Sequence, residues 1–239
     1  NARLAVPIQG LGAGERAWQT AIAYAQERKQ GRLPSSPPGE SVAIVQHPDV
    51  ARTLGTMRAL VAGMRAMIYF TAGAADQARF ADATEEREAA QVLTDILTPV
   101  AKGWCTDRGC EVADLGIQVH GGLGYIEETG AARIYRDARI TTIYEGTNGI
   151  QAIDLVGRKL CRDRGAGMAR LCGEMRQTMD GPAAADGLPA PMRAAVGDAI
   201  GRMSDCAAAI VDANDRDPAR VLAVATPFLK LCGHAIAAW

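Results

Sequence analysis

The residues best suited to chemistry lie in the segment RDARITTIYEGTNGIQ, residues 136–151. Glu145 follows an apolar and aromatic stretch and precedes a glycine and a predicted helix. Thr147 is suited to cap that helix, because its hydroxyl oxygen accepts a hydrogen bond from a first-turn N–H. A glutamate seated among Ile143, Tyr144 and a flat ligand would lose water and could abstract a proton. For this segment alone, a solvated loop glutamate is the better interpretation.

A second candidate segment is QVHGGLGY, residues 118–125. Consecutive glycines let a backbone approach a ligand closely and offer unobstructed N–H groups to a phosphate or a heterocycle. An HGG sequence also occurs in oxyanion loops of α/β-hydrolases. The chain has no G-x-S-x-G elbow and no predicted parallel sheet, so that interpretation is rejected.

The third segment is ERKQGR, residues 27–32, at the end of a predicted helix. Its cationic side chains could bind phosphate groups. Cations are also favoured at helix C-termini for electrostatic reasons, and capping is the better interpretation for this segment alone.

The elements that must position these segments are helices. After Pro48, apolar residues recur at steps of four and three, which predicts one buried stripe along a helix: Val50, Leu54, Met57, Val61, Met64 and Ile68. The same reasoning predicts further helices over residues 4–28, 84–102 with a continuation over 104–120, 147–164, 192–211 and 218–238. Glycine and proline content predicts a loop over residues 31–41, a tight turn without helix over 120–129 and a linker over 180–191.

No useful β-alternation occurs, so we expect an all-α fold built as an antiparallel helical bundle. Composition shifts after the helix that ends near residue 164. We therefore predict two parts, a bundle over residues 1–164 and an additional C-terminal helical module over residues 165–239.

Composition excludes several classes of function. Lys plus Arg number 26 against 27 for Asp plus Glu, which gives no global electrostatic case for binding nucleic acid. The six cysteines and three histidines have no metal-ligand spacing, so no metal site is expected and the thiols should be reduced. No apolar run approaches the length of a membrane span. We expect a cytoplasmic protein.

Together, in this order and at these separations, the three segments resemble the C-terminal domain of acyl-CoA dehydrogenases. The resemblance is strongest over residues 117–151 and is supported by residues 2–32. It covers about residues 1–160. The run EGTNGIQAIDLVGRKL and the helical extension after it resemble the long subgroup that includes 3-methylmercaptopropionyl-CoA dehydrogenases.

The resemblance implies an FAD-dependent oxidation of acyl-CoA to trans-2-enoyl-CoA in fatty acid metabolism. Glu145 occupies the position of the base that removes the α-proton, while the β-hydrogen leaves as hydride to flavin N5. The thioester carbonyl would be polarised by the backbone N–H of Glu145 and by a flavin ribityl hydroxyl. Tyr144 and Arg3 match residues that line the substrate site near the base.

The resemblance also assigns cofactor contacts and partners. Arg28 matches an arginine that contacts the flavin diphosphate from a neighbouring subunit, and Thr147 matches a flavin contact within the subunit of the base. Gln118, Gly121 and Gly122 match the turn against the adenosine end. The implied assembly is a homo-oligomer, either dimer or tetramer, and the implied electron acceptor is an electron-transferring flavoprotein.

Two departures from the family pattern affect these assignments. Many relatives have glutamine where Gly149 stands, and a Phe-Gly pair where this chain has QGR at residues 30–32. The N-terminal helical domain and central β-domain of the family are also outside these 239 residues, so we expect the chain alone to be inactive.

Two alternatives compete with a catalytic role. The helices could form a non-catalytic oligomerisation or docking module. The chain could also belong to a DNA-binding branch of the family, although its near-neutral charge and intact YEGT segment argue against that.

Overall fold

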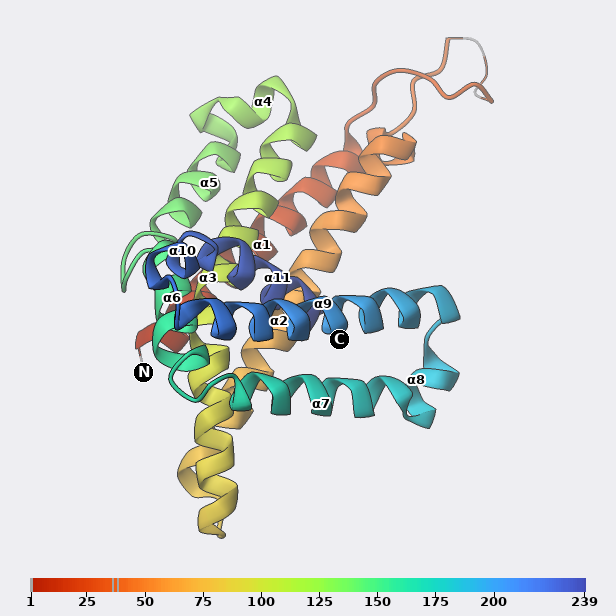
Figure 1. Cartoon of the computed structure of the whole chain (residues 1–239). Coiled ribbons are helices and arrows are strands. Elements are labelled where there is room, and N and C mark those ends of the chain that lie inside the picture. The colour runs from red at the N-terminus through yellow and green to blue at the C-terminus, as the bar shows by residue number, and fades with distance from the viewer. Residues whose placement is uncertain (1, 36, 38) are drawn as a thin grey trace. The chain divides into compact units, whose positions relative to one another are not determined.

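A computed structural model describes residues 2–35, 37 and 39–239, so Ser36 and Pro38 of the predicted loop over 31–41 lie outside the described residues. The described part of the chain is helical and contains no strand, apart from an isolated bridge between Lys29 and Ala43 (Figure 1). The predicted all-α class is confirmed. The residues form two compact units, and α1, α2 and α3 each contribute to both.

One unit contains residues 5–65 and 105–144. It takes most of α1 (Ala2–Glu27), the first half of α2 (Pro48–Phe80) and the second half of α3 (Thr84–His120). The predicted stripe on α2 is buried here at Leu54, Met57, Val61 and Met64, because it faces the neighbouring helices. Glycines let those helices approach closely, since a Cβ on Gly109 would lie 2.5 Å from the carbonyl oxygen of Gly10.

The same unit ends with short helices. α4 (Gly122–Tyr125), the 3-10 turn η2 (Glu127–Thr129) and α5 (Ala131–Ile140) follow α3. The prediction of a turn without helix over residues 120–129 is therefore wrong. Gly121 breaks the chain with a φ of +62°, and the glycines after it still close one helical turn, because the Gly124 N–H donates to the Gly121 carbonyl at 2.9 Å.

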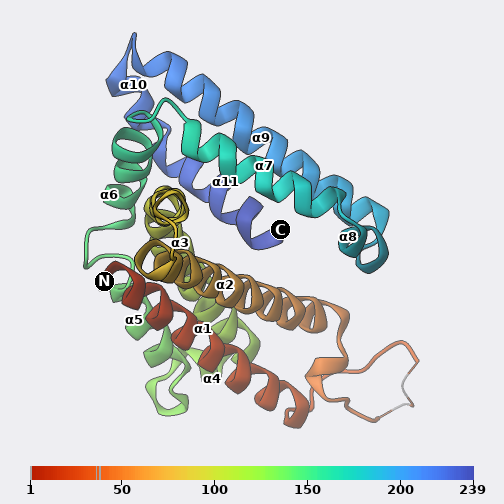
Figure 2. The same cartoon turned by 90° about the horizontal axis from the view of Figure 1, so that it is seen from below.

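The other unit contains residues 2–4, 66–104 and 145–239. Figure 2 shows its C-terminal helices α7, α9 and α11 side by side, and contacts join α9 to both of the others. A cavity of about 650 Å³ lies among α9, α10 and α11 and contains none of the predicted site residues in its lining. The elements of this unit after residue 145 are α6 (Asn148–Ile153), the π-helix η3 (Asp154–Leu160), α7 (Ala166–Asp180), α8 (Pro182–Gly187), α9 (Ala190–Asn214), α10 (Pro218–Ala223) and α11 (Ala225–Ala238).

Three secondary-structure predictions in this unit need correction. The helix expected over residues 147–164 ends its α-helical part at Ile153 and continues as η3. The expected linker over 180–191 contains α8. Proline is favoured at the first position of a helix, and Pro182 occupies that position. The helix expected over 218–238 is interrupted at Val224, between α10 and α11.

Candidate active site

Glu145 lies on a bend of the backbone immediately before α6. Glu145 has a φ of +56° and Gly146 a φ of +82°, so two successive residues are left-handed. Only glycine adopts this conformation at little cost. The Thr147 hydroxyl then accepts a hydrogen bond of 3.4 Å from the Ile150 N–H, which confirms its predicted role as the cap of α6.

Two side chains donate hydrogen bonds to the bend, and a third accepts one from the second of them. Gln151 donates from Nε2 to the carbonyl oxygens of Glu145 at 3.0 Å and of Gly146 at 3.4 Å. Lys102 donates from Nζ to the Gly146 carbonyl at 2.8 Å and to Asn148 Oδ1 at 2.9 Å. The carbonyls of the Glu145–Gly146 and Gly146–Thr147 peptides are therefore held by groups from α3 and α6.

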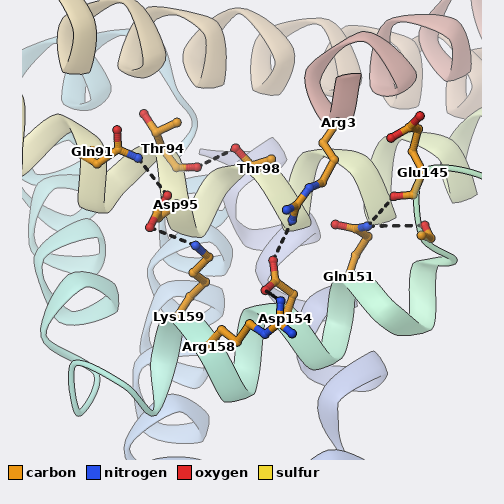
Figure 3. Close-up of polar contacts among 11 residues, drawn as sticks. Arg3, Gln91, Thr94, Asp95, Thr98, Glu145, Gln151, Asp154, Arg158 and Lys159 are labelled. Atoms are coloured by element: carbon orange, nitrogen blue, oxygen red, sulfur yellow. Dashed lines mark hydrogen bonds and ion pairs between the residues drawn. The ribbon is translucent and has the colours of Figure 1, made fainter. Parts of the chain in front are cut away.

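The Glu145 side chain is exposed in this chain. Figure 3 shows its carboxylate pointing away from Gln151, whose amide reaches the Glu145 carbonyl. Ile143 is 46% exposed and Tyr144 is 37% exposed. Ile143 and Tyr144 therefore do not shield the Glu145 carboxylate from water as the sequence predicted. A ligand, another domain or another protomer would have to cover it.

Arg3 lies against the helix that follows the bend. Its Nη1 is 2.9 Å from Oδ2 of Asp154, whose side chain is only 9% exposed, and Arg158 lies 3.8 Å from the other carboxylate oxygen (Figure 3). A nearly buried carboxylate requires such partners. Arg3 thus has a structural contact in addition to the substrate role predicted for it.

The glycine turn belongs to the unit of residues 5–65 and 105–144. His120 ends α3, stacks on Tyr24 of α1 with ring centroids 4.5 Å apart and bonds through Nδ1 to the Gly116 carbonyl at 2.7 Å. A Cβ added to Gly121 or Gly122 would meet nothing within 4 Å. The turn is thus anchored on one side and open on the other.

Arg28 and Gln118 are exposed residues of the same unit as the glycine turn. The Arg28 backbone N–H donates to the Tyr24 carbonyl, so Arg28 follows the residue on which His120 stacks by one helical turn. Its guanidinium contacts Gln30 Oε1 at 3.4 Å and, among the described residues, takes part in no ion pair. The tertiary structure therefore brings the last turn of α1 close to His120, the residue that begins the glycine turn.

Several residues that hold the bend, or that pair with predicted site residues, were not predicted from sequence as functional. Lys102, Asn148 and Gln151 hold it, and Asp154 pairs with Arg3. One signal was present for Lys102, which is the only charged residue in the apolar run from Val100 to Cys105.

Other classes of site find no support in the described part of the chain. No group of three His, Cys, Asp or Glu residues there could hold a metal ion. None of its helices is long and apolar enough to cross a bilayer.

Comparison with known proteins gives the family. Residues 1–160 match the family model for the acyl-CoA dehydrogenase C-terminal domain, and residues 171–239 match the model described as acetyl-CoA dehydrogenase C-terminal like. A 3-methylmercaptopropionyl-CoA dehydrogenase from Ruegeria pomeroyi is 44% identical over 100% of this chain and 40% of that relative. A butyryl-CoA dehydrogenase from Syntrophomonas wolfei is 36% identical over 68% of this chain and 27% of the relative.

The fold is shared with solved structures. An acyl-CoA dehydrogenase from Bacillus anthracis, in complex with FAD, superposes with a TM-score of 0.74 over 98% of this chain and 40% of that one, at 20% identity. This chain spans about 40% of the length of the Ruegeria relative. From the family-model match over residues 1–160 and the 44% identity along its whole length, we conclude that the chain belongs to the acyl-CoA dehydrogenase family.

Proposed function

We propose that this chain forms the C-terminal part of an FAD-dependent enzyme that oxidises acyl-CoA to trans-2-enoyl-CoA, with Glu145 as the base. The observation that carries the proposal is the bend at Glu145. A left-handed backbone fixed by Gln151 and Lys102 presents an exposed carboxylate immediately before α6. A solvated loop glutamate requires no such bend, which is costly for a residue other than glycine.

The reaction is an oxidation of two adjacent carbons. Glu145 takes the α-proton, the electron pair of that C–H bond becomes the new C=C bond, and the β-hydrogen departs with its electron pair. Bound FAD supplies the hydride acceptor for this step. Charge that develops on the thioester oxygen would be stabilised by the backbone N–H of Glu145, because a fixed N–H dipole needs no reorganisation during the reaction.

The residues of this chain fit an FAD contact at its surface. Arg28 is a cation outside any ion pair among the described residues, as a diphosphate contact requires. Gln118 is exposed, and nothing lies within 4 Å of a Cβ added to Gly121 or Gly122, which supports the proposal that this turn contacts the adenosine end. Thr147 lies next to the bend and would contact the flavin near the base. In our proposal the two sets belong to sites completed by a second protomer.

Tyr144 and Arg3 are proposed to line the substrate site. Tyr144 precedes the base and is 37% exposed, so its ring is available to cover an acyl chain. Arg3 keeps 43% of its side chain exposed although it pairs with Asp154. In our proposal both line the substrate site, while the cover over the carboxylate comes from outside this chain.

We further propose a homo-oligomer in the cytoplasm, with electrons passing to an electron-transferring flavoprotein. A relative from Acetobacterium woodii, 32% identical over 66% of this chain and 36% of its own length, is named as a subunit of a caffeyl-CoA reductase-Etf complex. Without the N-terminal and central domains of the family we expect no turnover, because those domains would supply most FAD and CoA contacts.

The test is to express the full-length protein that carries this chain and to measure flavin bleaching by a panel of acyl-CoA esters. Glu145→Gln should keep the yellow colour and the fold and lose bleaching by at least about a thousandfold, since the amide cannot accept the proton. Glu88→Gln, an exposed glutamate of α3, is the matched control and should bleach normally. Wild-type bleaching in Glu145→Gln would refute the assignment of the base.

A further inference from the structure

Lys102 is a charged residue in an unusual place. It lies in the middle of α3 between apolar neighbours and is 0% exposed. Lysine is almost never fully buried unless its ammonium is hydrogen-bonded, because desolvating the charge is costly. Its Nζ donates to the Gly146 carbonyl at 2.8 Å and to Asn148 Oδ1 at 2.9 Å. The buried cation is thus directed at the residues that immediately follow Glu145.

The second acceptor is itself fixed to the helix that carries the lysine. Asn148 donates from Nδ2 to the carbonyl of Gly103 at 3.1 Å, one residue after Lys102 on α3. The two contacts form a closed bridge between α3 and the start of α6. A bridge of this kind restrains the bend in position as well as in direction.

The bend needs such a restraint. A left-handed φ at a residue with a side chain persists only where the surroundings determine it strongly. Only glycine fits at position 146, since its φ is +82° and an added Cβ would lie 2.9 Å from Gln151 Nε2. The direction of the Glu145 side chain depends on these backbone angles, because they fix the direction of its Cα–Cβ bond.

We propose that Lys102 is a positioning residue for the base: it fixes the Gly146 carbonyl and thereby aims the Glu145 carboxylate at the α-carbon of the substrate. The proposal rests on the function proposed for Glu145. Gln151 also holds the bend, but from within α6. The positioning role is therefore proposed for the contact that comes from α3. A misplacement of about 1 Å can lower a rate about a hundredfold, so loss of this contact should affect the chemical step more than binding.

The test uses Lys102→Met in the full-length holoenzyme, which keeps the length of the side chain and removes the ammonium. We expect the rate constant of flavin reduction to fall about 10- to 100-fold, with the dissociation constant of the acyl-CoA changed less than about threefold. Lys159→Met is the matched control, since Lys159 is a partly buried lysine of the same unit that pairs with Asp95 at 2.9 Å. It should reduce flavin at the wild-type rate.

A second measurement isolates the base from hydride transfer. A CoA thioester with sulfur in place of the β-carbon has no hydride to lose, so release of deuterium from its α-carbon into water reports proton abstraction alone. Lys102→Met should slow this exchange by the same factor as flavin reduction. Equal FAD content and unfolding midpoint in the two lysine variants would show that the loss is one of geometry.

The outcomes separate this proposal from the function on which it rests. If Glu145→Gln exchanges deuterium normally, the base is wrong. If Glu145→Gln is inactive and Lys102→Met exchanges at the wild-type rate, the positioning role alone is overturned. Should Lys102→Met fail to fold, Asn148→Ala removes one anchor of the same bridge from a half-buried position. We expect a smaller fall, about three- to tenfold, and a wild-type rate in that variant would refute the bridge.

Discussion

A close approach of two helix backbones within one unit gives a prediction whose sign depends on the tertiary structure. Gly109 of α3 faces Gly10 of α1, and a Cβ on Gly109 would lie 2.5 Å from the Gly10 carbonyl oxygen. Alanine is favoured over glycine by about 1 kcal/mol in a helix interior. At Gly55 of α2, where an added Cβ meets nothing within 4 Å, Gly55→Ala should therefore stabilise the chain by about this amount.

The same change at Gly109 should destabilise it. Ordinary contact begins at 3.4 Å, so α1 and α3 would have to separate by about 0.9 Å. A gap of that size forfeits about a quarter to a half of the dispersion energy of the atom pairs across the crossing. Overpacking costs about 1 to 3 kcal/mol, and we take the upper value because backbone atoms cannot rotate away. After subtraction of the helix preference, Gly109→Ala should lose about 2 kcal/mol.

Thermal unfolding followed by circular dichroism measures both variants. For a chain of this size, each kcal/mol shifts Tm by about 2 to 4 °C. We expect Gly109→Ala to melt about 4 to 8 °C lower and Gly55→Ala about 2 to 4 °C higher than the parent chain. If Gly109→Ala melts at or above the parent Tm, the close crossing of α1 and α3 is wrong.

Two further predictions concern the buried core. Gly233→Ala should lower the free energy of unfolding by at least about 2 kcal/mol, because its Cβ would overlap the ring of the buried Trp104. Gly201→Ala, whose Cβ would face open space, should not lower it, and urea titration measures both variants. Burial raises the thiol pKa of Cys105 and Cys232 above the ordinary value of 9.0. Above about pH 9 the unfolded thiols release protons that the native ones keep, so stability should fall as pH rises, by up to about 1.4 kcal/mol per pH unit for each thiol. An undiminished slope in Cys105→Ala, measured by urea titration at several pH values, would contradict this explanation.

Helical periodicity predicted the long helices well. The helices expected over residues 4–28 and 84–120 correspond to α1 and α3, and the stripe after Pro48 is the buried face of α2. An apolar period of three and four residues is a local property that packing preserves. The family was also predicted from motifs, and the match over residues 1–160 confirms it.

Short elements were predicted less well. The glycines at 121–124 and the small residues at 182–187 were interpreted as breaks, although α4 and α8 form there. A single helical turn has almost no periodicity to detect, and its stability comes from the elements at its ends. The boundary between residues 164 and 165 stays a prediction.

The sequence by itself determined the long helices, the family and the candidate base Glu145 with Thr147 as the cap of α6. Only the tertiary structure decided what holds the bend at Glu145, because Lys102 and Gly146 are 44 residues apart in the chain and meet through the packing of α3 against the start of α6. A lone lysine in an apolar run predicts a buried side chain. The sequence does not show which group accepts a hydrogen bond from that lysine. Exposure of the Glu145 carboxylate was likewise decided by the fold, since two left-handed residues turn the chain there and the apolar neighbours do not cover it.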